Sequence, residues 1–147
     1  MIEIRHRDTE EILLVVEADS LEGVDLSGKD LRGAYLRQAT LRGANLANAL
    51  LDGAHLGTAD LYTTRLDGAS LRGAQLARAN MRMASVRGAD LRQASLYEVL
   101  LDEADLRGSD FRGADLRAIS LRGATYSRQT RWPFLFNPRK LGAEFER

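Results

Sequence analysis

The sequence contains no cysteine, and this absence excludes disulfide bonds, thiolate metal ligands and cysteine nucleophiles. Proline occurs only twice, aromatic residues make up 6% of the chain, and Lys29 and Lys140 are its only lysines. Net charge is also missing, because 21 basic residues balance 21 acidic ones. No apolar run approaches the ~20 residues of a membrane-spanning helix, and the N-terminus has no apolar signal segment. We therefore expect a soluble, cytoplasmic protein without a membrane partner.

What the chain does contain is a five-residue period. From Leu21 to Leu121 every fifth residue is large and apolar, which gives 21 positions without a miss. Only Met81, Val86 and Phe111 among these centres are not leucine. Alanine is typical two residues before each centre, and Asp, Asn or Ser is typical directly before it. Arginine and then glycine often follow, so that the consensus is Ala-(Asp/Asn/Ser)-Leu-Arg-Gly.

This period fits neither of the two common secondary structures. On an α-helix each step of five turns the side chain by about 140°, so the leucines would spiral around all sides. On a flat strand each odd step would send alternate leucines to opposite faces. The pattern instead predicts a backbone that turns a corner in every repeat and keeps the leucines and alanines on one inner axis. Glycine after the arginine suits such a corner because it tolerates positive φ.

Several repeats resemble the pentapeptide-repeat family, notably Ala-Asn-Leu-Ala-Asn at 44–48 and Gly-Ala-Asp-Leu-Arg at 88–92 and 113–117. The resemblance covers residues 19–126. It implies an all-β fold, a right-handed quadrilateral β-helix in which four pentapeptides make one coil of 20 residues. On that basis the repeats form a β-solenoid of about five coils. The Thr63-Thr64-Arg65 segment departs furthest from the consensus, and we expect a bulge there.

Both ends of the solenoid need a cover, since each coil contacts only its neighbours. We expect an N-terminal cap at 1–18, the solenoid at 19–126 and a C-terminal cap at 127–147. Apolar residues at 2–4 and 12–16 flank a polar turn and predict a short hairpin. Asn137-Pro138 predicts the start of a short helix that reaches about Phe145.

The C-terminal segment also carries a group of large apolar side chains, and two interpretations stay open for it. The group consists of Trp132, Phe134, Leu135 and Phe136. These side chains cover the last coil, or they form a dimer interface, because caps and interfaces favour the same residue types. The protein is thus expected to be a monomer or a weak homodimer through an end cap. Opposite end charges add head-to-tail association as a hypothesis: residues 1–18 hold two basic and five acidic groups, and 127–147 hold five basic and two acidic groups.

The residues give no support for catalysis. His6 and His55 lie far apart and lack ligand spacing, so we predict no metal site. No serine stands in a nucleophile elbow, and a convex rod offers little concavity for acid–base chemistry. We therefore predict no catalytic residues and no cofactor.

The outer surface remains, and coils of 20 residues would stack its side chains into columns. The candidate interaction surface is the column that holds Tyr35, His55, Gln75, Ser95 and Asp115, with Tyr97 adjacent. Exposed tyrosine is typical of recognition surfaces. A second column places Arg72, Arg92 and Arg112 beside Asp90 and Asp110, which predicts surface ion pairs.

Two functions from different classes follow. The first is a non-catalytic repeat scaffold or protein-interaction module with an unidentified protein partner. The alternative comes from the family resemblance, since some relatives protect DNA gyrase or topoisomerase IV from inhibitors with a rod that resembles duplex DNA. The outward charges of this chain nearly cancel on each predicted face, which weakens mimicry of a type II topoisomerase substrate. The interleaved Asp residues also argue against direct nucleic-acid binding.

Overall fold

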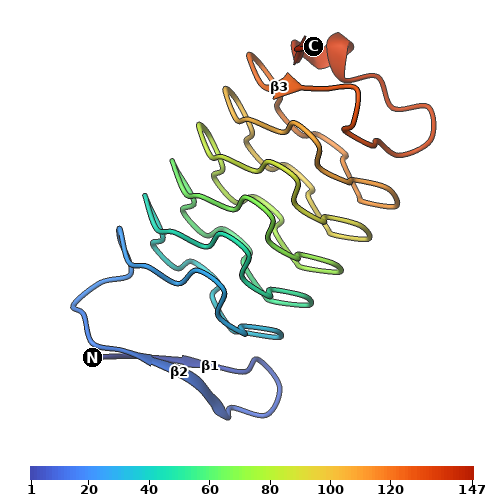
Figure 1. The fold of residues 1–147 in the computed structure, drawn as a ribbon. Coiled ribbons are helices and arrows are strands. Elements are labelled where there is room, and N and C mark those ends of the chain that lie inside the picture. Colours follow the sequence, from blue (N-terminus) through green and yellow to red (C-terminus); the bar gives the residue numbers. More distant parts are fainter.

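The computed structural model describes residues 1–147 and shows a rod of stacked coils with one chain terminus at each end (Figure 1). Its named elements are short and lie at the two ends: β1 (Ile2–Arg5), β2 (Ile12–Val16), β3 (Thr125–Tyr126), the 3-10 helix η1 (Pro138–Leu141) and β4 (Glu144–Phe145). Between β2 and β3 the chain consists of single β-bridges separated by turns. No helix has the length and apolar character needed to cross a membrane.

Backbone pairing between coils repeats every 20 residues. Parallel bridges join Asp25 to Asn45, Asn45 to Arg65, and so on along the rod. The N–H of Leu46 donates to the carbonyl of Arg65 at 2.7 Å, and the N–H of Arg65 donates to the carbonyl of Ala44 at 3.0 Å. One coil therefore takes up 20 residues, or four pentapeptides, which is the number that the family resemblance implies.

The interior is a ladder of large apolar side chains with alanines between them. All 21 centres from Leu21 to Leu121 are buried, and most have no exposed area. These centres belong to one continuous core of 41 buried residues. The inner axis predicted from the five-residue period is confirmed. Thr64 replaces an alanine in this interior, and its hydroxyl donates to the carbonyl of Leu41 at 2.7 Å.

Every repeat turns at the same place. The N–H of the alanine donates back to the carbonyl of the preceding centre, as from Ala34 to Leu31 at 3.0 Å. The residue just before that alanine has a positive φ in all 21 repeats, and in 11 of them it is glycine. A positive φ at this turn position is typical of a type II turn, which favours glycine there. The prediction that glycine marks the corner is confirmed, but ten repeats form the same corner with another residue.

The N-terminal end is the expected hairpin. β1 and β2 pair antiparallel, with Ile2 opposite Val16 and a register shift between Ile4 and Arg5. Ile4 and Val16 are buried in the core. The N–H of Tyr35 donates to the carbonyl of Arg5 at 2.7 Å, so the hairpin extends the hydrogen-bonded ladder beyond the first coil.

The C-terminal end differs from the expected helix to about Phe145. Asn137 caps η1 as predicted, since its side chain accepts from the N–H of Arg139. The helix is only one 3-10 turn, because Gly142 adopts a left-handed conformation with φ of 87° and ends it. The chain then forms β4, which pairs in parallel with β3 through Thr125–Glu144 and Tyr126–Phe145. Strand pairing with the last coil thus replaces further helix.

The bulge expected at Thr63-Thr64-Arg65 is wrong. Arg65 pairs with Ser85 and Asn45 at the regular spacing. The segment keeps its register because Thr63 accepts a φ of 56° and the hydroxyl of Thr64 has a carbonyl partner inside the rod. The ladder gains one residue only near its C-terminal end, where Asp110 pairs with Arg131 instead of residue 130.

Candidate interaction surface

The structure stacks the predicted column on one side of the rod, which we call the tyrosine face: Tyr35, His55, Gln75, Ser95 and Asp115, joined in series by bridges, with Tyr97. The ring of Tyr35 is about half exposed and meets the ring of His55 edge-on, with centroids 5.6 Å apart. Stacking at the coil spacing therefore brings together an aromatic pair from residues 20 apart in the sequence.

Tyr97 and Asp115 lie further along the same face and share one arginine. The guanidinium of Arg117 lies 5.4 Å from the centroid of the Tyr97 ring, a cation–π distance. Arg117 also pairs with Asp115 at 2.8 Å. Asp115 is thus already neutralised by its own repeat. The tyrosine and the arginine are the groups of this pair that offer a partner apolar surface and positive charge.

A shallow depression of about 400 Å³ lies between these two aromatic groups. Its lining consists of Arg37, His55, Gly57, Thr58, Ala77, Arg78 and Tyr97. Gly57 and Ala77 stand at the outward position where Arg37, Tyr97 and Arg117 stand in the other coils of this face. Gly57 has no positive φ, and an added Cβ would meet only ordinary contacts of 3.5 Å or more. Glycine at this position is therefore not required by the backbone, and its effect is to leave the depression open.

The imidazole of His55 forms part of this depression. Burial lowers the pKa of His55, and the nearby positive charges of Arg37 and Arg7 lower it further. The ring is therefore neutral at pH 7 and presents one donor and one acceptor.

The corner that borders the tyrosine face contains no glycine. Its five residues, one from each coil, all have positive φ: Gln38, Thr58, Arg78, Glu98 and Ala118. The other three corners are mostly glycine. A left-handed backbone costs a residue with a Cβ roughly 1–2 kcal/mol. Strained backbone of this kind is concentrated at functional sites in proteins. We call this edge the glycine-free corner.

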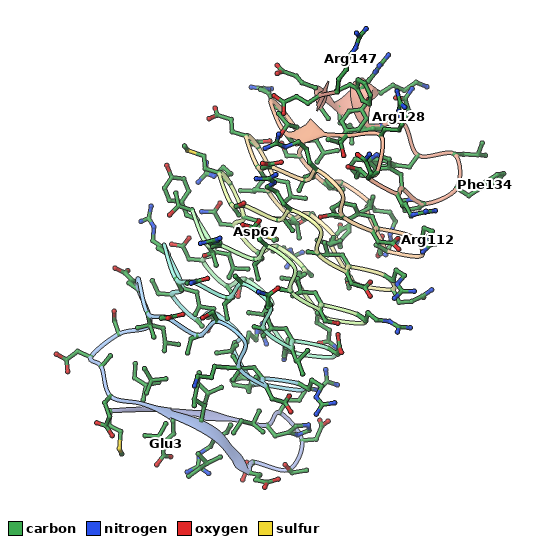
Figure 2. The ribbon with its side chains drawn as sticks, viewed as in Figure 1. Glu3, Asp67, Arg112, Arg128, Phe134 and Arg147 are labelled. Atoms are coloured by element: carbon green, nitrogen blue, oxygen red, sulfur yellow. The ribbon has the colours of Figure 1, made fainter.

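The C-terminal aromatic group divides into two pairs. Trp132 stacks on Phe111 of the last coil with centroids 4.9 Å apart, and Phe136 stacks on Trp132 at 5.1 Å. Phe134 and Leu135, by contrast, are 92% and 86% exposed, at the tip of a loop that leaves the side of the rod (Figure 2). We call these two residues the apolar tip. They border a hollow of about 380 Å³ with Leu116 and Arg117, next to the end of the tyrosine face.

The other sides of the rod are occupied by paired charges. On what we call the aspartate–arginine face, Arg92 binds Asp90 at 2.7 Å and Arg112 binds Asp110 at 2.6 Å. Arg92 also reaches Asp110 of the next coil at 3.8 Å. The predicted surface ion pairs are present, and each joins residues of one repeat before it joins coils.

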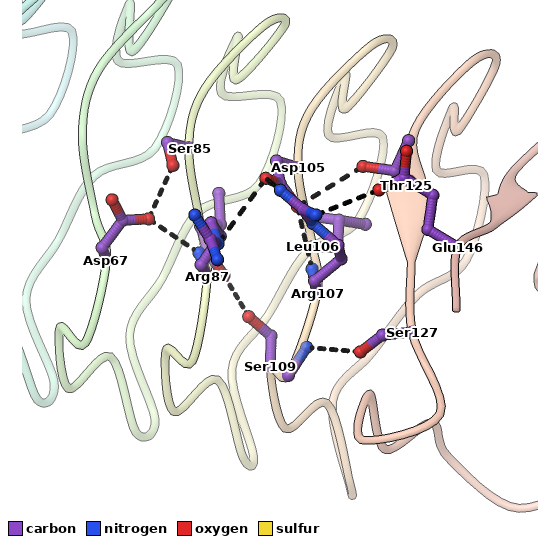
Figure 3. A network of polar contacts seen from close by, with 12 residues as sticks. Asp67, Ser85, Arg87, Asp105, Leu106, Arg107, Ser109, Thr125, Ser127 and Glu146 are labelled. Atoms are coloured by element: carbon purple, nitrogen blue, oxygen red, sulfur yellow. Dashed lines mark hydrogen bonds and ion pairs between the residues drawn. The ribbon is translucent and has the colours of Figure 1, made fainter.

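A second kind of aspartate ties one coil to the next. Asp67 accepts from the hydroxyl of Ser85 at 2.6 Å and from the N–H of Arg87 at 2.9 Å, 18 and 20 residues later (Figure 3). Asp52 accepts in the same way from Ser70 and Arg72, and Asp102 from Ser120 and Arg122. These aspartates stand after the centre of their repeat instead of before it. They therefore join neighbouring coils and leave little free negative charge.

No three His, Asp or Glu side chains converge in a geometry that could hold a metal ion. Sequence reasoning named the aromatic residues of the tyrosine face but missed the depression at Gly57 and Ala77. It also missed the glycine-free corner. The signal for both was present, because every residue at 38, 58, 78, 98 and 118 departs from the glycine of the consensus.

Comparison with known proteins agrees with this geometry. Among solved structures, a trypsin-treated variant of QnrB1, a plasmid-mediated fluoroquinolone resistance protein, aligns over 83% of this chain and 79% of its own with a TM-score of 0.61 and 17% identity. A second trypsin-treated QnrB1 variant aligns over 83% and 77% with a TM-score of 0.56 and 18% identity. The pentapeptide repeat protein alr5209 from Nostoc Pcc 7120 is 30% identical over 83% of this chain and 84% of its own, with a TM-score of 0.38.

A search of curated proteins finds no match. The family model for pentapeptide repeats, by contrast, matches residues 20–57, 59–93 and 89–125 in eight copies. These ranges include nearly all of the bridged coils. The chain belongs to the pentapeptide-repeat family.

Proposed function

We propose that the protein is a non-catalytic scaffold that binds a protein partner through the tyrosine face. One observation carries the proposal: the departures from the consensus collect on this side of the rod. The exposed ring of Tyr35, the open depression at Gly57 and Ala77, and the glycine-free corner all lie along it. The other sides keep glycine corners and paired Asp and Arg side chains, which a scaffold needs for its own stability.

The chemistry of the face indicates how a partner would contact it. Tyr35 and Tyr97 offer aromatic surface, which is enriched among residues that dominate binding energy. Arg37 forms no ion pair and borders the depression, so an acidic or amide side chain of the partner is favoured there. The apolar tip of Phe134 and Leu135 extends the surface at one end. A cytoplasmic location remains a prediction from the sequence.

The test is a capture experiment with a matched control. Tyr35→Ala/Tyr97→Ala removes both rings from the tyrosine face. Tyr62→Ala removes a tyrosine from another side, where it lies in an equivalent cation–π contact with Arg42 at 4.7 Å. We expect bound proteins to be lost from the double variant and retained by Tyr62→Ala. Equal recovery from all three forms would exclude the tyrosine face as the binding surface.

The alternative function is protection or inhibition of DNA gyrase or another type II topoisomerase. Its support is the fold shared with QnrB1, together with the right-handed coiling that the family implies. Charge weighs against it, because duplex DNA carries about one negative charge per 1.7 Å, whereas Asp90, Asp105 and Asp110 are each paired with an arginine. A gyrase supercoiling assay with and without a quinolone decides the question: neither inhibition nor protection would eliminate this alternative.

A further inference from the structure

The charges outside ion pairs are not spread evenly along the rod. At the N-terminal end five exposed acidic residues have no ion-pair partner: Glu10, Glu11, Glu17, Asp19 and Glu22. At the C-terminal end six exposed basic residues have none: Arg122, Arg128, Arg131, Arg139, Lys140 and Arg147. Few opposing charges are free nearby, chiefly Lys29 at the first end and Glu144 at the second. One end is therefore acidic and the other basic, although the total charge is zero.

Each end also exposes apolar side chains. On the hairpin, Ile4 and Val16 point into the rod, and Ile12 and Val15 are more than 40% exposed, with Met1 beside them. At the opposite end, Leu141 of η1 and Phe145 of β4 are about 40% exposed. Figure 2 places Glu3 at one extremity of the rod and Arg128 and Arg147 at the other. An acidic apolar surface and a basic apolar surface thus face in opposite directions.

We propose that the acidic N-terminal end of one molecule docks on the basic C-terminal end of a second copy. Two identical ends would repel each other, whereas unlike ends attract and can bury their apolar side chains together. The contact is heterologous, so each docked molecule presents a free end of each kind, and the rods extend into an open fibre. This self-association does not depend on which partner the tyrosine face binds.

The proposal is tested by sedimentation of three triple variants and the natural chain. The N-end variant is Glu10→Lys/Glu11→Lys/Glu17→Lys, and the C-end variant is Arg128→Glu/Arg131→Glu/Lys140→Glu. None of these six side chains forms an ion pair. The mid-rod control is Arg37→Glu/Arg72→Glu/Arg82→Glu, which changes the net charge as much as the C-end variant but leaves both ends intact. Circular dichroism checks that each variant is folded.

We expect the natural chain to associate with increasing concentration at low salt and to dissociate in about 0.5 M salt, where charges are screened within a few ångströms. Each end variant should weaken self-association by about tenfold or more, because three attractive contacts become repulsive. The mid-rod control should still associate. An equimolar mixture of the two end variants should associate again, since one supplies a natural C-terminal end and the other a natural N-terminal end.

Three results would overturn the proposal. The first is a natural chain that stays monomeric at every concentration and salt. The second is association that survives both end variants but disappears in Phe134→Asp/Leu135→Asp, which would assign the contact to the apolar tip. The third is equal loss of association in the mid-rod control and the C-end variant, which would assign the effect to net charge alone.

Discussion

The tyrosine face and the aspartate–arginine face are built on the same interior but differ at their surfaces. On the aspartate–arginine face the corner is glycine in four of the five coils, at 33, 53, 73 and 113, and Asp90 and Asp110 pair with the arginine of their own repeat. On the tyrosine face no corner is glycine, and small residues open a depression where an arginine is typical. The consensus describes what the fold needs, so departures from it that share one side indicate another selective reason.

The largest expected effect tests what the two faces share. Leu71 lies beneath the aspartate–arginine face and Leu76 beneath the tyrosine face, and both have no exposed area. Leu71→Asp and Leu76→Asp each bury an unpaired charge, which should cost several kcal/mol and open the rod locally or unfold it. Thermal unfolding measures both. A Leu76 variant with unchanged unfolding would contradict a common interior under the two faces.

A smaller effect separates the two kinds of aspartate. Asp67→Ala removes the acceptor for the Ser85 hydroxyl and the Arg87 N–H of the next coil, and we expect a loss of about 1–3 kcal/mol. Asp110→Ala removes a surface ion pair with Arg112, for which about 0–1 kcal/mol is expected. Urea unfolding compares the two variants. Equal losses would refute the distinction between aspartates that join coils and those that pair within a repeat.

Substitutions at the two corners should have opposite signs. Gly73 has a φ of 65° with open space around its Cβ position, so Gly73→Ala adds backbone strain without a clash and should destabilise by about 1 kcal/mol. Thr58 has a φ of 55°, and Thr58→Gly relieves the strain of a β-branched residue, for which we expect a gain of up to about 1 kcal/mol. Chemical unfolding measures both. Destabilisation by Thr58→Gly as large as that by Gly73→Ala would show that the glycine-free corner carries no strain.

Acid should affect the two faces in separate pH ranges. Hydrogen bonds from Arg92 and Arg112 hold the pKa of Asp90 and Asp110 below its usual value. Their stabilisation is therefore complete above the unfolded pKa of about 3.9 and is lost as the pH falls through the folded pKa. Burial, and then Arg37 and Arg7, lower the pKa of His55. Its contribution is complete above about pH 6.5 and declines below that value.

Unfolding temperature measured against pH separates these contributions. His55→Gln should remove the small decline between about pH 7 and 5 and leave the larger decline below pH 4 in place. A natural chain and a His55→Gln variant with the same profile would show that this imidazole is not shielded.

The interior could be predicted almost completely from the sequence, because the five-residue period places every leucine from Leu21 to Leu121 without reference to long-range contacts. The surface could be predicted only in part. Tyr35 and His55 share a column once the 20-residue coil is known, but the depression depends on what residues 20 and 40 positions apart leave unfilled. The partnership of Asp67 with Ser85 has the same origin, since a spacing of 18 has no meaning before the coil length is known.

The ends were the hardest to predict because the period stops there. The sequence treated Trp132, Phe134, Leu135 and Phe136 as one apolar group. The structure packs Trp132 and Phe136 against the last coil and exposes Phe134 and Leu135, and Leu135 has a φ of 64°. Composition alone does not distinguish these roles, since they depend on where the chain leaves the ladder. The helix expected to about Phe145 failed for the same reason, because pairing of β4 with β3 is a long-range contact.

The most direct measurement of the central claim, that the tyrosine face binds a partner, is the affinity of the captured partner for Ala77→Arg. This change fills the depression with a side chain that the same outward position carries at Arg37 and Arg117, so the fold should be unaffected. The matched control is Ser27→Arg, which places an arginine at the equivalent repeat position on another side. Isothermal titration should show binding weakened by about tenfold or more for Ala77→Arg, and unchanged for Ser27→Arg. Equal affinity of both variants and the natural chain would contradict the claim.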